Sequence, residues 1–332
     1  MPELRKDPVT GRWVIIATAR AQRPQHHALR PRRVETGPCP FCAGNEAMTP
    51  PEVLAYRTDQ NQLGKAGWTV RVVPNKYPAL VNEDHGLRND DDFYQSMNGL
   101  GVHEVIIENP EHVENMALLS EKQLETVLLA YRDRRLHFRA DSRWRCVLIY
   151  KNQGAEAGAT LPHVHSQLVV LPSVPRAVLE ELDGAKRFYE ATGRCIYCEM
   201  IRKEIDERKR IVAEHEYFVA LCPYAARFPF EVWILPREHA SCFEKSLPHI
   251  YIDLARVLRE TLIRLDRQLD DPPFNYIVHS NPLGESENGF YHWHIEIMPR
   301  LTQVAGFEWG SGSYINPVAP EDAARLLRQI TL

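Results

Sequence analysis

The sequence predicts an α+β fold made of two similar halves, and the main support is a repeated order of motifs. Each half contains a Cys-x-x-Cys pair, then predicted strands, a lone histidine, an amphipathic helix, a strand and a His-x-His motif on a further strand. The interval from the lone histidine to the His-x-His motif is also similar, 51 residues from His112 to His163 and 53 residues from His239 to His292. An internal duplication explains this repeat better than chance.

The boundary between the halves is predicted near the middle of the chain. We expect a first domain at 1–182 and a second at 183–332, with the seam in the charged segment 183–194, DGAKRFYEATGR. The pattern is compatible with strands that join across this seam into one continuous sheet.

Length and composition are those of an ordinary globular protein. The 332 residues are 44% hydrophobic and 25% charged, which is enough for a sizeable core. The formal net charge of -4 gives no bulk attraction to nucleic acid or to an anionic membrane, so we expect neither as a partner. No apolar run has the form of a signal peptide or approaches membrane-spanning length, and the expected location is the cytoplasm.

Elements of the first half follow from residue type and periodicity. A helix is expected at 120–139, because Ser120 and Gln123 form a capping-box signature and apolar residues from Leu124 to Tyr131 recur at helical spacing. Strands are predicted from β-branched and aromatic content. They are 13–17, 68–73, 103–109, 145–151 and 166–172.

The second half repeats this order. An amphipathic helix is expected within 248–268, and residues 84–97 in the first half are expected to form a surface loop. The predicted strands are 217–223, 230–236, 274–280 and 292–299.

Four of the seven cysteines lie in two C-x-x-C pairs, a spacing typical of metal sites rather than of disulfides. Two thiolates and two imidazoles form a closed tetrahedral shell, so we expect a structural zinc ion in each half, with iron as the other candidate metal in the second. A redox pair or buried core cysteines are the alternatives. His279 is a rival ligand in the second half. The predicted ligands are Cys39, Cys42, His112 and His163, then Cys195, Cys198, His239 and His292.

The stretch LPHVHSQLVV (161–170) predicts a nucleophile. Alternation on a strand points His163 and His165 to the same face, so if His163 binds metal, His165 keeps a ring nitrogen for chemistry. A neutral imidazole can attack a phosphoryl group and form an N–P bond that is readily broken again. Gln167 lies on the same strand face and can donate a hydrogen bond to a phosphate oxygen. His294 is the counterpart of His165 in the second half, where a structural or metal-related role is expected.

Groups suited to phosphate lie on either side of this motif in the chain. The segment YKNQGAEAGAT (150–160) contains two glycines, which let backbone N–H groups approach a phosphate, and Asn152 and Thr160 add side-chain donors. Near the N-terminus, Arg20 and Arg23 have guanidinium groups that suit a sugar phosphate or a diphosphate, although a solvated basic loop is the alternative there.

Together these motifs resemble the galactose-1-phosphate uridylyltransferase family, a branch of the histidine-triad superfamily. The resemblance covers nearly the whole chain. Its segments are 4–24, CPFC (39–42), VVPNKYPAL (72–80), HEVIIENPEH (103–112), KNQGAEAGATLPHVHSQ (151–167) and 305–328. It implies two histidine-triad-like halves that form an antiparallel sheet with helices packed on one side, and a homodimer.

The resemblance also implies a ping-pong reaction on nucleotide-sugar and hexose 1-phosphate substrates. His165 would attack the α-phosphate of UDP-glucose and form a uridylyl-histidine, with Gln167 as its phosphate-side partner, and galactose 1-phosphate would then take the uridylyl group. The implied substrate contacts are Arg20, Arg23, Asn75, Asn152, Gly158, Thr160 and Ser166.

Some features are more similar to the plant relatives that act as ADP-glucose phosphorylases. The best-known uridylyltransferases have glycine where this chain has Ser166, and the second cysteine pair and the segment GFEWGSGSYINP (306–317) also resemble the plant branch. Uridylyl transfer is the slightly favoured hypothesis, and adenylyl transfer to phosphate is the alternative.

Three other functions compete with these. A hydrolase of the same superfamily would let water take the nucleotidyl group. A zinc-organised nucleic-acid-binding protein is disfavoured by the acidic balance and by the lack of a basic stripe with aromatic residues. A structural metalloprotein with an inactive site is disfavoured by the intact His-Val-His-Ser-Gln motif beside the glycine-containing loop.

Overall fold

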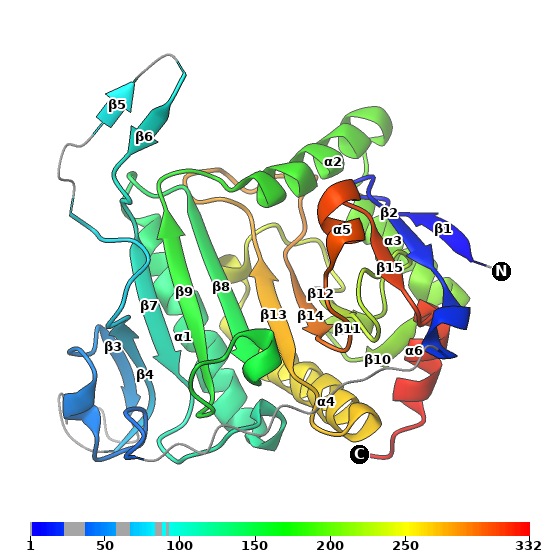
Figure 1. Ribbon diagram of the computed structural model, residues 1–332. Coiled ribbons are helices and arrows are strands. Elements are labelled where there is room, and N and C mark those ends of the chain that lie inside the picture. The colour runs from blue at the N-terminus through cyan, green and yellow to red at the C-terminus, as the bar shows by residue number, and fades with distance from the viewer. Residues whose placement is uncertain (1, 23–36, 58–66, 84–87, 91–92) are drawn as a thin grey trace.

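The computed structural model describes residues 2–22, 37–57, 67–83, 88–90 and 93–332, and its centre is one sheet of ten strands. All neighbouring strands in this sheet are antiparallel. The order is β10-β11-β12-β14-β13-β8-β9-β7-β4-β3 (Figure 1). The strands are β3 Leu54–Arg57, β4 Trp68–Pro74, β7 Val102–Ile107, β8 Cys146–Gln153, β9 His165–Leu171, β10 Ile211–Glu214, β11 Phe218–Leu221, β12 Val232–Pro236, β13 Phe274–His279 and β14 His294–Pro299.

The strand order shows the duplication directly. From the outer edge inward, the first half reads β3, β4, β7, β9, β8 and the second half reads β10, β11, β12, β14, β13. The two series meet where β8 pairs with β13, with Asn152 opposite Asn275, and so the halves share one continuous sheet. The segment 183–194, where the seam was predicted, is the end of helix α2 and the turn that follows it.

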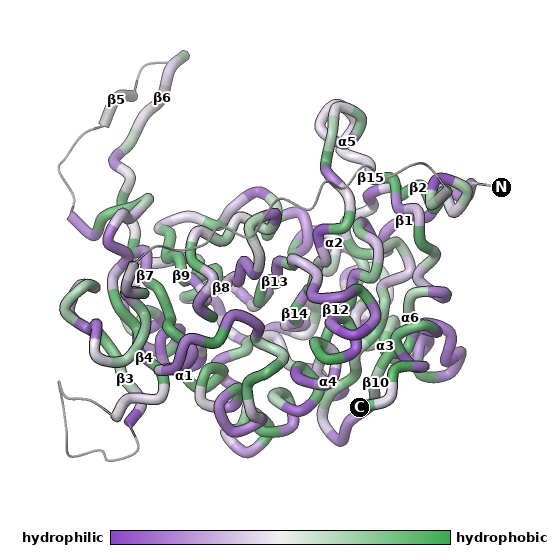
Figure 2. Tube along the Cα trace, turned by 60° about the horizontal axis from the view of Figure 1, so that its bottom comes forward, coloured by the Kyte–Doolittle hydropathy of each residue, from purple (hydrophilic) through white to green (hydrophobic). Residues whose placement is uncertain are grey.

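Two long helices pack on one face of this sheet, α1 Glu121–Arg139 and α4 Tyr251–Leu269, as the periodicity predicts. Helix α1 begins as expected, because Ser120 accepts a hydrogen bond from the backbone N–H of Gln123 at 3.1 Å. In Figure 1 both helices lie behind the strands, and in Figure 2 hydrophobic colour follows the strands while hydrophilic colour gathers on outer turns. The main core therefore lies between the sheet and these two helices.

The opposite face is covered in the second half only, which corrects the expectation of helices on one side. Helices α2 Arg176–Thr192 and α3 Ile196–Glu207 pack there against β11 and β12, where Leu182 of α2 and Trp233 of β12 belong to one buried cluster. Over β7 and β9 no helix in the described residues packs on this face, and the loop with Cys39 and Phe41 lies there against Val105 and Ile107. One part of the sheet therefore stays open for a site.

Smaller elements complete the fold. A three-stranded sheet lies beside the second half, and the hairpin of β5 and β6, in the segment predicted as a surface loop, projects from the body in Figure 1. No helix in the described ranges is long and apolar enough to cross a membrane. The remaining elements are β1 Glu3–Lys6, β2 Trp13–Ile16, β5 Arg88–Asp90, β6 Gln95–Met97, β15 Tyr314–Asn316, α5 Gly306–Ser311 and α6 Pro320–Arg328.

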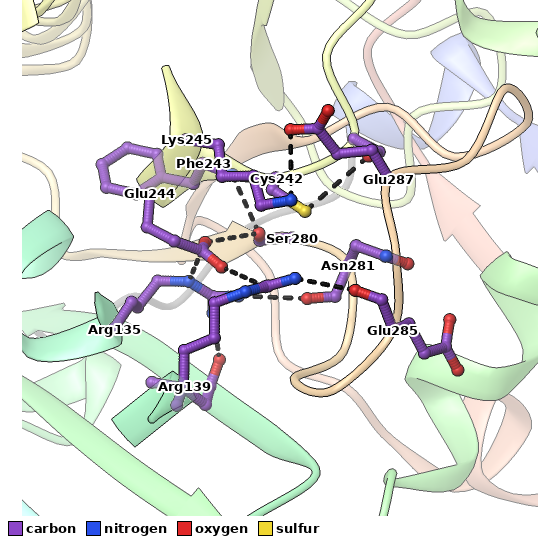
Figure 3. Close-up of polar contacts among 12 residues, drawn as sticks. Arg135, Arg139, Cys242, Phe243, Glu244, Lys245, Ser280, Asn281, Glu285 and Glu287 are labelled. Atoms are coloured by element: carbon purple, nitrogen blue, oxygen red, sulfur yellow. Dashed lines mark hydrogen bonds and ion pairs between the residues drawn. The ribbon is translucent and has the colours of Figure 1, made fainter. Parts of the chain in front are cut away.

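A buried ion-pair network joins the halves on the helix side of the sheet (Figure 3). Arg135 of α1 contacts Glu244 of the second half at 2.7 Å and also donates to the carbonyl of Asn281 at 3.1 Å. Arg139 donates to the same carboxylate at 2.8 Å and to the carbonyl of Glu285 at 2.7 Å. The Glu244 side chain is fully buried, so its charge depends on these two guanidinium groups.

Replacing this carboxylate should destabilise the protein strongly. Glu244→Ala leaves two arginine side chains without their partner, one of them fully buried, and we expect a loss of about 3–5 kcal/mol in the free energy of unfolding. Denaturant unfolding followed by circular dichroism measures it. The control is Glu287→Gln, which removes an ion pair with Lys245 from a side chain that is 59% exposed, and should cost about 1 kcal/mol or less. Equal losses in the two variants would contradict the assignment.

Candidate active site and metal centres

His165 begins β9 and faces the side of the sheet that α1 and α4 do not cover. Its Nδ1 lies 2.7 Å from the carbonyl oxygen of His163, so Nδ1 carries the proton and donates it. The lone pair is therefore on Nε2. Burial lowers the pKa of His165, which favours this neutral form, and the Phe41 ring packs 5.2 Å from the imidazole centroid. The ring is thus neutral and held in one orientation, with its lone pair on Nε2.

Gln167 lies two residues further along the same face. Its Oε1 accepts from His103 Nε2 at 2.8 Å and from the Tyr150 hydroxyl at 3.2 Å. With the oxygen held by two donors, the amide nitrogen is the end that remains to donate to a ligand.

The loop after β8 supplies a turn with positive φ angles beside this face. Gly154 has φ 83°, and a Cβ there would lie 2.7 Å from Pro273, so only glycine fits. Gly158 has φ 92°. Asn275 donates to Asn152 Oδ1 and to the Ala157 carbonyl, both at 2.8 Å, and so a strand of the second half holds both the loop and the predicted donor of the first.

Ser166 points the other way. Its hydroxyl is buried on the helix side of the sheet and contacts Glu108 and Tyr131, and Tyr131 also contacts Tyr276. We expected Ser166 among the substrate contacts, but alternation along β9 places its side chain behind the strand, away from His165. Its hydroxyl therefore helps to hold β9 against the elements on the helix side of the sheet.

The same buried network reaches the nucleophile strand through Lys151. The ammonium group pairs with Glu108 and donates to the carbonyl of His165 at 3.0 Å. Both side chains of this ion pair are almost completely buried. The sequence reasoning did not identify either residue, because each reads as an ordinary polar position at the end of an apolar strand.

The predicted ligands of the first half come together. The sulfur of Cys42 lies 3.4 Å from His112 Nδ1 and 3.6 Å from His163 Nδ1, and the sulfur of Cys39 lies 3.6 Å from His163 Nδ1. A tetrahedral ion with bonds of about 2.3 Å to sulfur and about 2.0 Å to nitrogen separates these atoms by about 3.5 Å. His163 Nε2 donates to the carbonyl of Asn109 at 2.8 Å, which leaves Nδ1 as the ligand atom.

The second group has the same geometry. Cys198 sulfur lies 3.6 Å from Nδ1 of both His239 and His292, and His292 Nε2 donates to the Pro236 carbonyl at 3.0 Å. In each of these two four-residue groups, the ligand atoms all lie within 4.8 Å of one another, so both groups could hold a metal ion. His279, the rival ligand, is not part of this group.

The counterpart of the nucleophile is closed in the second half. His294 donates through Nδ1 to the His292 carbonyl at 3.0 Å, as His165 does to His163. Its ring, however, is fully buried and stacked between Trp233 and His279, with centroids at 5.1 Å and 4.6 Å. Helices α2 and α3 cover this face, and access for a substrate is lost.

Charge also differs between the two copies. Where the first half has Gln167, the second has Glu296, whose carboxylate pairs with Arg227. Burial opposes protonation of His279, yet the carboxylates of Glu181 and Glu296 raise its pKa to about 10. Burial lowers the pKa of the neighbouring His294 to about 4. The space beside His294 therefore contains paired charged side chains, and no amide corresponds there to Gln167.

The remaining predicted substrate contacts differ in position. Asn75 and Thr160 lie near the His165 face, whereas Arg20 does not. Asn75 follows β4 and contacts His103, with Nδ2 at 3.2 Å from Nε2 of that ring. Thr160 is exposed in the loop that leads to His163. Arg20 follows β2 beside β15, and Figures 1 and 2 show β2 and β9 on opposite sides of the molecule. Arg23 lies outside the described residues.

Comparisons with known proteins agree with this architecture. Two family models match, described as the N-terminal and C-terminal domains of galactose-1-phosphate uridyl transferase, over residues 1–175 and 181–331. The chain belongs to the galactose-1-phosphate uridyl transferase family. Members of this family act on nucleotide sugars and sugar phosphates, and this chain is a nucleotidyltransferase of that family.

Individual relatives cover the whole chain. The ADP-glucose phosphorylase of Arabidopsis thaliana is 39% identical over 100% of this chain and 93% of its own length. The galactose-1-phosphate uridylyltransferase of Thermotoga maritima is 30% identical over 99% of this chain and 98% of its own. The crystal structure of the Arabidopsis thaliana ADP-glucose phosphorylase with bound ADP-glucose superposes with a TM-score of 0.86 at 38% identity, covering 100% of both chains.

Replacing one cysteine of either group should remove the metal ion of that group alone. We expect two equivalents of metal per chain in the purified protein, one in Cys39→Ser and one in Cys195→Ser, as measured by elemental analysis. Each variant should also melt at a lower temperature, because the ion ties the Cys39–Cys42 loop, or the first turn of α3, to two distant histidines. Cys222→Ser, a cysteine in a buried apolar cluster apart from both groups, is the control that keeps both equivalents. A wild-type protein without metal would overturn both sites.

Proposed function

We propose that the chain is a nucleotidyltransferase that works through a covalent nucleotidyl-His165 intermediate. The observation that carries the proposal is the bond from His165 Nδ1 to the His163 carbonyl, which leaves the Nε2 lone pair on the open face beside Gln167. An arrangement in which Nδ1 donates to the protein is what an imidazole nucleophile requires, because the positive charge that develops on the ring is shared with a carbonyl acceptor.

The reaction proceeds in two displacements. In the first, Nε2 attacks the α-phosphorus of a nucleoside diphosphate hexose, an N–P bond forms, and the bond to hexose 1-phosphate breaks. Gln167 donates to a non-bridging oxygen as charge develops there, and Asn152 and the glycine-containing loop, with Thr160, hold the phosphate. In the second, an acceptor phosphate oxygen attacks the same phosphorus and releases His165.

An adenylyl group transferred to inorganic phosphate is the preferred form of this reaction. The support is the higher identity to the ADP-glucose phosphorylase, 39% against 30% for the uridylyltransferase, at nearly complete coverage of the chain in both cases. This reverses the slight preference for uridylyl transfer that the motifs alone gave. Uridylyl transfer to galactose 1-phosphate is the second candidate, supported by the family models over both halves.

We propose zinc as the metal in both four-residue groups. Each group offers two sulfurs and two imidazole nitrogens, which is a complete tetrahedral set without an open position, so the ion supplies stability and takes no part in the reaction. In the first half it also positions the Cys39–Cys42 loop, which carries Phe41 against His165.

The homodimer stays a prediction. The position of Arg20 suggests what a second copy of the chain would contribute to the site. Arg20 follows β2 and His165 begins β9, and these two strands lie on opposite sides of the molecule within one chain (Figures 1 and 2). A contact between Arg20 and a substrate at His165 would therefore require a second copy of the chain.

The proposed intermediate can be detected directly. Mixing the protein with ADP-glucose, without an acceptor, should add the mass of one adenylyl group, and acid should remove it because N–P bonds are acid-labile. Intact-protein mass spectrometry measures the adduct, and UDP-glucose tested in parallel assigns the base. A uridylyl adduct alone would move the protein to the second candidate, whereas no adduct from either donor would reject this proposal.

The duplication offers a matched control for the nucleophile. His165→Ala should abolish the adduct, a loss of at least about 1,000-fold in transfer, because the imidazole that forms the N–P bond is removed. His294→Asn alters the counterpart histidine in the closed copy and should still form the adduct in its folded fraction. Loss of the adduct in both variants, with folding intact, would count against His165 as the attacking residue.

A further inference from the structure

His103 on β7 contacts two segments that carry predicted substrate contacts, strand β9 with Gln167 and the turn that begins at Asn75. Its Nδ1 accepts a hydrogen bond from the backbone N–H of Ala79 at 3.2 Å, so Nδ1 is the unprotonated nitrogen. The proton of the neutral ring is then on Nε2, which donates to Oε1 of Gln167 at 2.8 Å. Nδ2 of Asn75, 3.2 Å from the same Nε2, is also a donor, so that contact is not a hydrogen bond in this tautomer. The backbone N–H of Ala79 thereby selects the tautomer that can hold Gln167.

The direction of this bond decides which end of the Gln167 amide faces a substrate. With Oε1 accepting from His103 and from Tyr150, the NH₂ group is left to donate to a phosphate oxygen. An amide turned by 180° would present its oxygen to the phosphate, and two acceptors would repel each other. A side chain that only filled space at position 103 would not prevent this rotation.

The same histidine organises the turn that contains Asn75. The backbone N–H of Asn75 donates to the His103 carbonyl at 2.8 Å, and its Oδ1 accepts from the N–H of Tyr77 at 2.9 Å. Together with the Ala79 contact, these bonds attach the turn at 75–79 to both the backbone and the ring of His103. His103 is buried, with 9% of the residue exposed, and each ring nitrogen has a partner.

We infer that His103 is a positioning residue for nucleotidyl transfer, which fixes the amide of Gln167 with its NH₂ group toward the phosphate and ties that orientation to the Asn75 turn. The inference rests on the proposed function, because it gives Gln167 the role of a phosphate donor. His103 itself contacts no reacting atom in this arrangement. Its effect on the reaction passes through Gln167.

Two substitutions separate the two ring contacts. In His103→Gln the amide nitrogen lies near the position of Nε2 and can still donate to Gln167. In His103→Asn the shorter side chain lies near the position of Nδ1, where it can accept from Ala79 but does not reach Gln167. The measurement is the single-turnover rate of adduct formation at saturating ADP-glucose or UDP-glucose, whichever labels the wild type, together with the dissociation constant of that donor.

The inference expects the asparagine variant to form the adduct about 10- to 100-fold more slowly, with a much smaller change in donor affinity. The glutamine variant should recover most of the rate. Thermal unfolding and metal content of both variants show whether the fold is intact. Equal loss in the two variants, or a loss confined to donor affinity, would overturn the inference.

A double-mutant cycle with Gln167→Ala makes the test independent of absolute rates. If His103 acts through Gln167, His103→Asn should slow the reaction in the wild-type background and change it by less than about twofold in the Gln167→Ala background. The same fold-loss in both backgrounds would show that His103 acts elsewhere. A wild-type protein that forms no adduct would reject the proposed function itself, which is a different outcome from either result of the cycle.

Discussion

The hydrogen bond between the His165 ring and the His163 carbonyl is the interaction on which the rest of the site depends. It joins two residues whose side chains have different tasks, since His163 directs Nδ1 at the cysteine sulfurs while His165 directs Nε2 at the open face. Because both side chains come from nearby positions of one chain segment, the backbone fixes the candidate metal group and the proposed nucleophile relative to each other. The Lys151 ammonium donates to the His165 carbonyl and so holds the strand from the helix side of the sheet.

The two halves show that this local geometry is necessary and not sufficient for a site. His294 repeats the ring-to-carbonyl bond and follows an equivalent cysteine and histidine group. Helices α2 and α3 nevertheless cover its face, Trp233 stacks on its ring, and Glu296 replaces the amide donor. A buried carboxylate repels phosphate, and an inaccessible imidazole cannot attack it. The first copy alone therefore keeps the arrangement that the chemistry needs.

The closed half still contributes to the open one. Asn275 of β13 reaches across the junction of the sheet to Asn152 and to the Ala157 carbonyl, so the phosphate loop of the first half rests on a strand of the second. On the helix side, Glu244 binds Arg135 and Arg139 of α1 and fixes the halves relative to each other. Side chains of both halves therefore set the position of the loop.

The sequence by itself determined the features that depend on local pattern. The paired C-x-x-C and His-x-His motifs, the capped helix that begins after Ser120 and the shared face of His165 and Gln167 follow from spacing, and the strand period also directs Ser166 to the opposite face. Only the tertiary structure decided which histidine faces Gln167, because His103 is 64 residues away and meets it through the pairing of β7 with β9. It likewise decided that Arg20 lies far from His165 and that helices close the second copy. These outcomes depend on long-range packing, which no local period encodes.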